Sequence, residues 1–96
     1  MQTQRTHRTD SNQAAIVRAL RQAGASVCSL AGVGSGCPDL LVGWNGANLL
    51  LEVKNLDGRG LRFTPAERAF ADAWAGRVYV ATNVQQALAV LDDGCD

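Results

Sequence analysis

The sequence predicts one small α/β domain in which helices flank a small mixed sheet. Segments with the helical period alternate with short apolar runs that are typical of strands. The dipeptide Asn45-Gly46, the strongest short signal for a hairpin turn, separates two of those runs. The expected order is helix, three strands, helix, strand, helix, an order in which the helices cover a layered sheet.

The first helix is expected over residues 11–23. Its apolar residues recur at helical spacing, and Gly24 follows as a helix stop. Three polar residues stand where a side chain can cap the start, namely Asp10, Ser11 and Asn12. A short strand is expected next, over residues 26–30.

Residues 40–44 and 49–53 are predicted to be the two antiparallel strands of a hairpin. If the asparagine and glycine between them occupy the two central turn positions, Trp44 faces Ala47. The register of the whole hairpin follows from that one pair.

The sequence Thr64-Pro65-Ala66-Glu67 has the layout of a helix start, because threonine can cap, proline suits the first helical position and glutamate can close a capping box. A helix is expected over residues 65–75, ended by Gly76, with a buried face made of Ala69, Phe70, Ala73 and Trp74. A strand over residues 77–81 and a third helix, from the cap Asn83 to about Leu91, complete the order. The residues expected to face inward from that helix are Val84, Ala87, Leu88 and Leu91.

The composition is that of an ordinary globular protein, with 96 residues of which 47% are hydrophobic and 19% charged. No apolar run approaches the roughly 18 residues of a membrane helix, so no membrane contact is expected. The cysteines lack a CxxC pair, which argues against a disulfide framework and a structural zinc site; they are Cys28, Cys37 and Cys95. Because so small a domain buries a modest fraction of its surface, a homodimer is expected.

The charges sum to zero but are unevenly spread along the chain. Residues 1–9 are expected to form a flexible basic tail, residues 10–91 the domain and residues 92–96 an acidic tail. The first ten residues have no apolar core, so neither an export signal nor an anchor is expected and the protein is placed in the cytoplasm. Charge alone does not indicate a nucleic-acid partner.

Three charged side chains are expected to converge at one end of the hairpin. Counting on from the turn, Asp39 stands opposite Glu52, and Lys54 projects to the same face. Opposed carboxylates repel each other by on the order of a few kcal/mol when partly screened from water, so a shared proton or a divalent cation is expected between them. An oxygen-only pair suits Mg²⁺ or Mn²⁺. The alternative is an Asp39 that ends a turn beside a surface pair of Glu52 and Lys54.

A metal held by two carboxylates beside an ammonium group suits the hydrolysis of phosphodiesters. The metal lowers the pKa of a bound water, and the lysine positions that water or neutralises charge that builds on the phosphate. Two arginines of the following loop, Arg59 and Arg62, either contact a nucleic-acid backbone or belong to a solvated loop.

The glycine-rich loop before Asp39 leads into a strand and not into a helix N-terminus, so it is not expected to cradle a phosphate. Gly34 and Gly36 are instead expected to permit a positive φ and to leave room for a DNA backbone or a partner subunit beside the site.

Four short motifs follow one another along residues 10–91. They are Gly36-Cys37-Pro38-Asp39, Leu51-Glu52-Val53-Lys54, Phe63-Thr64-Pro65-Ala66-Glu67 and Gly76-Arg77-Val78-Tyr79-Val80. In this order and spacing they resemble the virus-type replication-repair nuclease (VRR-NUC) family of the PD-(D/E)xK nucleases. The resemblance implies a restriction-endonuclease-like core and a Mg²⁺-dependent DNA endonuclease, with Mn²⁺ as a substitute metal.

The resemblance also implies partners and a setting. Similar stand-alone proteins, often encoded by phages or prophages, act as dimers on branched DNA such as four-way junctions. Branched DNA, a homodimer and a bacterial cell or phage-infected host are therefore expected for this chain.

Carried to the matching positions, the resemblance implies that Asp39 and Glu52 are metal ligands and that the main-chain carbonyl of Val53 is a further ligand. It implies that Lys54 is the catalytic lysine. All of these lie where the hairpin count places the charged face.

Two positions depart from the family pattern. The family commonly has a glutamate near the start of the first helix, where this chain has Asp10, either a ligand or a helix cap, with Asn12 and Gln13 nearby. The family usually has a glutamine in its second helix, where this chain has Glu67, for which a capping role is a sufficient explanation. The alternative function is thus a catalytically weak or inactive DNA-binding or phage-assembly module that retains the nuclease fold.

Overall fold

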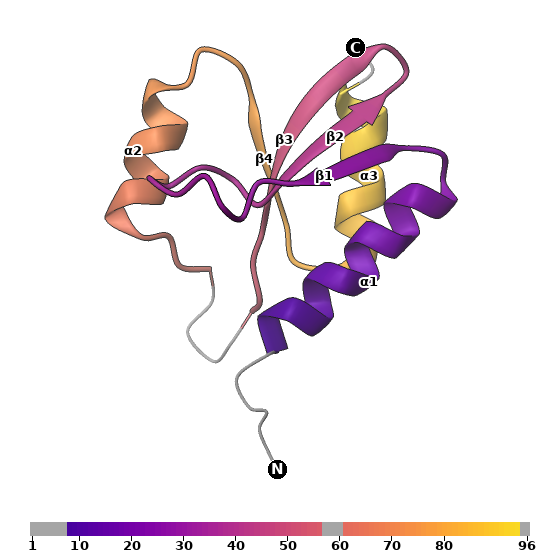
Figure 1. The fold of residues 1–96 in the computed structure, drawn as a ribbon, viewed down its shortest axis with the longest axis horizontal. Coiled ribbons are helices and arrows are strands. Elements are labelled where there is room, and N and C mark those ends of the chain that lie inside the picture. The colour runs from indigo at the N-terminus through magenta and orange to yellow at the C-terminus, as the bar shows by residue number, and fades with distance from the viewer. Residues whose placement is uncertain (1–7, 57–60, 95–96) are drawn as a thin grey trace.

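The computed structural model describes residues 8–56 and 61–94 and, within the first helix, side chains from residue 12 onward. The order of elements is the expected α-β-β-β-α-β-α, and it confirms a mixed α/β domain (Figure 1). The elements are α1 (Arg8–Gln22), β1 (Ser26–Ser29), β2 (Leu40–Trp44), β3 (Ala47–Val53), α2 (Pro65–Ala73), β4 (Val78–Ala81) and α3 (Val84–Gly94).

The four strands form one sheet in the order β1-β2-β3-β4. The first three are antiparallel neighbours, whereas β4 pairs with β3 in parallel after the crossover through α2. The central strand β3 is therefore hydrogen-bonded on both sides, and residues that follow it lie between two neighbouring strand ends.

The hairpin of β2 and β3 has the register that its turn predicts. Asn45 and Gly46 have φ angles of 53° and 83°, as the two central residues of a type I′ turn require. Trp44 pairs with Ala47, and the count continues without a slip to Leu40 opposite Leu51. The prediction of the register is confirmed over the whole length of β2.

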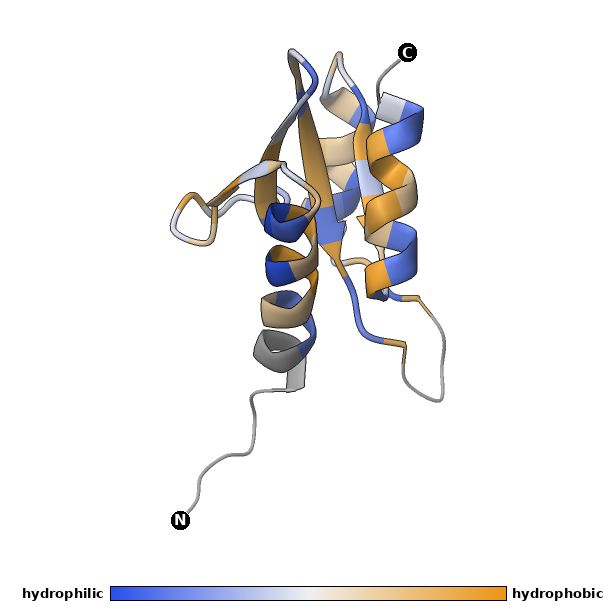
Figure 2. Ribbon diagram, turned by 90° about the vertical axis from the view of Figure 1, so that its right-hand side faces the viewer, coloured by the Kyte–Doolittle hydropathy of each residue, from blue (hydrophilic) through white to orange (hydrophobic). Residues whose placement is uncertain are grey.

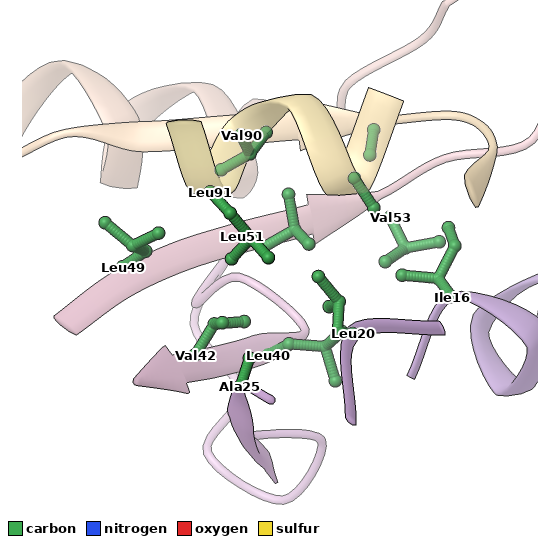
Figure 3. Packing of buried hydrophobic residues seen from close by; sticks show 12 residues of the cluster. Ile16, Leu20, Ala25, Leu40, Val42, Leu49, Leu51, Val53, Val90 and Leu91 are labelled. Carbon is green, nitrogen blue, oxygen red and sulfur yellow. The ribbon is translucent and has the colours of Figure 1, made fainter. Parts of the chain in front are cut away.

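The hydrophobic core lies between the sheet and the helices α1 and α3, which cover the same face (Figures 1 and 3). Alternate strand residues point into it, because successive side chains on a strand face opposite sides. Figure 2 shows hydrophobic residues concentrated in the strands and on parts of the helices. The core residues are Ile16, Leu20, Ala25, Leu40, Val42, Leu49, Leu51, Val53, Ala81, Ala87, Val90 and Leu91.

Helix α2 lies apart from the other two helices, on the opposite side of the sheet (Figure 1). None of its residues is buried, so the prediction that it buries Ala69, Phe70, Ala73 and Trp74 is wrong. A cavity of about 220 Å³ lies between this helix and strand β4. Its apolar stripe thus borders a hollow instead of a packed core, a difference that helical periodicity alone does not reveal.

Several helix boundaries differ from the prediction. Helix α1 begins at Arg8, so residues 10–12 lie within it and do not cap it. Helix α2 ends at Ala73, because Trp74 adopts an extended conformation before Gly76 is reached. Helix α3 extends to Gly94 and so runs into the segment 92–96 that the sequence set apart as an acidic tail.

The predicted capping groups of the other two helices are confirmed. Asn83 accepts a hydrogen bond from the main-chain N–H of Gln86 at 2.8 Å. Thr64 and Glu67 form the expected reciprocal capping box at the start of α2. None of the helices in the described part of the chain is long and apolar enough to cross a membrane.

Candidate functional site

The side chain of Asp39 is hydrogen-bonded to the end of β3. The residue lies just before β2, and its Oδ2 accepts a hydrogen bond of 2.7 Å from the main-chain N–H of Val53. Its own main-chain carbonyl accepts one of 2.8 Å from the N–H of Leu30. Asp39 is thus held through both its side chain and its main chain, and its negative charge lies near enough to Glu52 to raise the pKa of that group.

Glu52 is the one buried charged residue in the described part of the chain, with an exposed fraction of 5%. It lies on the face of β3 opposite the core, because the core residues Leu51 and Val53 precede and follow it. Burial, together with the negative charges of Asp39 and Glu67, raises the pKa of Glu52 to about 8, although the positive charge of Lys54 opposes the shift. At neutral pH this carboxyl group holds a proton, or a cation must take the place of the proton.

Lys54 follows the last residue of β3, and its main-chain N–H donates to the carbonyl of Ala81 at 3.0 Å. Its Nζ lies 2.6 Å from Oε1 of Glu67 and 3.6 Å from Oε2 of Glu52. Burial opposes the charge on Lys54, but the hydrogen bond and charge of Glu67 outweigh it, so the pKa of Lys54 is raised. The amine therefore stays protonated beside both carboxyl groups.

Glu67 joins the second helix to this cluster. Its Oε1 accepts from the N–H of Thr64 at 2.9 Å, within the capping box, and also from the amine of Lys54. Burial disfavours its charge, but the hydrogen bonds from Lys54 and Thr64 prevail and lower the pKa of Glu67. One carboxylate thus caps α2 and pairs with Lys54.

The first helix reaches the site through an amide. Asn12 Nδ2 donates to the main-chain carbonyl of Lys54 at 3.3 Å. Gln13 lines an open hollow on the outside of α1 with Arg18 and Arg21. The side-chain amides of Asn12 and Gln13 therefore lie on different surfaces of the molecule. Asp10 lies within α1, but its side chain is outside the described residues.

Gly36 packs against the start of α2. Its φ of 79° is in the left-handed region, and a Cβ at this position would overlap the main-chain carbonyl of Ala66. Only glycine allows this approach. The glycine-rich loop therefore holds the first turn of α2 close to Asp39, three residues farther along the chain.

Gly34 also has a positive φ, of 77°, but open space surrounds it. Arg62 is exposed in the segment that leads into α2. Arg59 lies outside the described residues.

A divalent cation fits the chemistry of the cluster. Asp39 and Glu52 supply the oxygen donors that Mg²⁺ and Mn²⁺ prefer, and their mutual repulsion is what a cation would relieve. Among the side chains that the structure describes, those of residues 12–56 and 61–94, no three of metal-binding types gather into one group. A cation here would take further ligands from water and from a main-chain carbonyl such as that of Val53.

Two residues beside the cluster were not singled out from the sequence, and both contribute to the cavity under α2. Phe63 precedes the cap of α2, and Arg68 lies in its first turns; both line the cavity together with Glu52 and Glu67. Phe63 was visible only as the first residue of a motif. Nothing in the sequence reveals that a hollow lies behind it.

No protein-family model matches this chain, and no curated protein or solved structure is significantly similar to it.

Proposed function

We propose that this protein is a metal-dependent DNA endonuclease with a restriction-endonuclease-like core of the VRR-NUC type. The observation that supports it most is the buried Glu52, with the Asp39 carboxylate on one side and the Lys54 amine on the other. Burying a carboxyl group among like charges costs stability, so such a group indicates a functional site. The α-β-β-β-α-β-α order around the hairpin supports the same proposal.

In this proposal Asp39 and Glu52 hold Mg²⁺, and Val53 adds its main-chain carbonyl. When bound, the cation supplies Lewis-acid activation of the phosphate and of a water. Lys54 offers a protonated amine to the phosphate oxygens, where it stabilises the charge that develops during hydrolysis. Glu67 positions this amine through its hydrogen bond of 2.6 Å.

The proposal includes a homodimer acting on branched DNA in a bacterial or phage-infected cell. Its support is the motif set and the small size of the chain.

An assay on duplex, flap and four-way-junction DNA tests the activity, each with Mg²⁺, with Mn²⁺ and with EDTA. Cleavage is expected with either metal and is expected to vanish in EDTA. It should also vanish in Asp39→Asn, whose amide oxygen can still accept from Val53, and in Lys54→Met. The matched control is Asp93→Asn, which changes an exposed carboxylate that pairs with Arg77. Cleavage that survives Asp39→Asn or Lys54→Met would refute the assignment.

The second candidate is a DNA-binding or assembly module without turnover. The observation in its favour is the pairing of Lys54 with Glu67, because an amine bound to a carboxylate is less available to a phosphate. Calorimetry with Mn²⁺ separates the two candidates. Binding that disappears in Asp39→Asn supports the nuclease, and no heat at millimolar Mn²⁺ supports the module.

A further inference from the structure

Phe63 is an exposed aromatic residue beside two cations. Its exposed fraction is 37%, although it stands directly before the cap of α2. The Lys54 Nζ lies 5.2 Å and the Arg68 guanidinium carbon 5.9 Å from the centroid of its ring. An exposed ring next to positive charge is the combination with which proteins bind single-stranded nucleic acid, where bases stack on rings and cations meet phosphates.

The ring borders a cavity whose lining includes both apolar and charged side chains. The cavity has a volume of about 220 Å³ and lies between α2 and β4. Its apolar lining includes Pro38, Phe70, Val78 and Val80, whereas Glu52 and Glu67 of the candidate site also line it. The hollow and the proposed phosphate site are therefore continuous.

A nucleobase fits this arrangement better than a general apolar ligand does. One sugar joins a base to its phosphate, so a phosphate at Asp39 and Glu52 would bring an attached base to the adjoining hollow. A base within a duplex is stacked on both faces and paired at its edge, so only an unpaired base can turn into the hollow. Arg68, at the rim, lies where it can contact a phosphate of the same strand.

We infer that Phe63 and the cavity behind it receive one unpaired nucleobase of the DNA strand whose phosphate lies at Asp39 and Glu52. This inference rests on the proposed function and adds a contact to a base. Phe63 is a positioning residue here, because it holds the base and does not touch the reacting phosphate.

Binding measured with Ca²⁺ in place of Mg²⁺ tests the inference, because a cation is needed to hold a phosphate beside two carboxyl groups and Ca²⁺ also takes oxygen ligands. Denaturing gels check that the DNA stays intact during the measurement. A duplex with a short single-stranded extension is labelled, and an abasic nucleotide is moved along the extension one position at a time. Fluorescence anisotropy is expected to show about tenfold weaker binding by the wild-type protein at one position, where the stacked base has been removed. Phe63→Ala should bind intact DNA about tenfold more weakly than the wild-type protein does. Its binding should not weaken further when the abasic nucleotide is introduced.

Matched variants separate stacking from apolar area and from folding. Phe63→Leu keeps an apolar side chain without the ring and should behave as Phe63→Ala does, whereas Phe63→Trp should keep the wild-type profile. Leu61→Ala removes an exposed apolar residue two positions earlier, 47% exposed, and should also keep it. Circular dichroism of each variant checks that α2 is retained.

An abasic profile that is flat in the wild-type protein overturns the inference, as does a profile that is unchanged in Phe63→Ala and Phe63→Leu. Cleavage with Mg²⁺ is measured separately. An abasic effect that depends on Phe63, without any cleavage, would support the base site and refute the nuclease. Cleavage with a flat abasic profile would support the nuclease and refute the base site.

Discussion

At Glu52 the stability of the fold and the proposed function make opposite demands. Its side chain is buried on a sheet face, yet Asp39 and Glu67 add negative charge around it. Burial and these charges raise its pKa to about 8 from an ordinary value of 4.5. The unfolded chain has no such environment, so protonation of this group is linked to stability.

In metal-free buffer, the free energy of unfolding is expected to fall as the pH rises from about 4.5 to about 8 because of Glu52. In this range the folded protein keeps a proton on Glu52 that the unfolded chain releases, so stability decreases with rising pH. Urea unfolding at a series of pH values measures this change in the free energy of unfolding. Glu52→Gln cannot titrate, and the difference between its profile and that of the wild-type protein isolates this residue.

Asp93→Asn, far from the cluster, should leave the pH profile unchanged. Parallel profiles of Glu52→Gln and wild type between pH 4.5 and 8 would show that Glu52 is ionised in the folded protein, contrary to the raised pKa.

Glu67 has two roles that one substitution can separate. Glutamine can still accept from Thr64 in a capping box, but it carries no charge for Lys54. In Glu67→Gln the pKa of Lys54 should therefore fall, because the carboxylate that raises it is gone. The titration of the Lys54 amine, followed by NMR, measures this, and cleavage should persist.

Glu67→Ala is the comparison, since it also removes the side-chain half of the capping box, in which Glu67 accepts from the N–H of Thr64. It should also destabilise the protein, because the N–H of Thr64 loses its acceptor, although the Thr64 hydroxyl can still accept from the main-chain N–H of residue 67. An unchanged Lys54 titration in Glu67→Gln would mean that the ion pair does not form in solution.

At the scale of elements, local chemistry accounts for what the sequence predicted well. The turn residues Asn45 and Gly46 set the register of the hairpin, and the register places Asp39 beside Glu52. Both signals involve residues close in the chain. The position of Glu67 beside Lys54 depends on how α2 returns to the sheet, which no local pattern contains.

Helix α2 is held to the domain near its N-terminus. The contacts there are the ion pair of Glu67 with Lys54 and the close approach of Gly36 to Ala66. Since none of its residues is buried, little apolar burial opposes a shift of this helix. The geometry of the candidate site therefore depends on a glycine in a loop distant from α2 in the sequence.

Gly36→Ala is expected to destabilise the protein by more than the roughly 1–2 kcal/mol that a left-handed backbone costs a residue other than glycine. The added Cβ overlaps the backbone of Ala66, so α2 must also move. The matched control is Gly34→Ala, because Gly34 has nearly the same φ but open space around it. This substitution should lower the free energy of unfolding only by the cost of the left-handed backbone. Chemical denaturation of both variants gives the comparison.

Cleavage should fall in Gly36→Ala and persist in Gly34→Ala. Equal destabilisation by the two substitutions would contradict the contact between the loop and α2.

At the scale of the whole molecule, the sequence predicted the order of layers but not how completely they are covered. The sequence assigned residues 49–53 to a strand, and in the structure alternate residues of that strand, Leu49, Leu51 and Val53, are buried. Helical periodicity assigned α2 a buried face that it lacks, because periodicity shows which side of a helix is apolar and not what covers it. The hairpin residues of the candidate site could be predicted from the sequence, whereas the cavity beside Phe63 could not.

The exposed C-terminal end of α2 indicates where two chains of the expected homodimer would meet. Trp74 is 48% exposed and stacks on Phe70 with ring centroids 5.1 Å apart. Large aromatic side chains of this kind supply much of the binding energy at protein interfaces. Phe70 also lines the cavity beside Phe63, so a dimer contact at Trp74 would lie next to the proposed base site.

Light scattering is therefore expected to give twice the chain mass of 10.1 kDa for the wild-type protein and a mass nearer one chain for Trp74→Gln. Leu56→Gln is the control, because it removes another exposed apolar side chain, 62% exposed, and should leave the dimer intact. A wild-type mass of one chain at every concentration would refute the homodimer. A dimer that persists in Trp74→Gln would place the interface elsewhere, because the Trp74 ring could then be removed without cost to association.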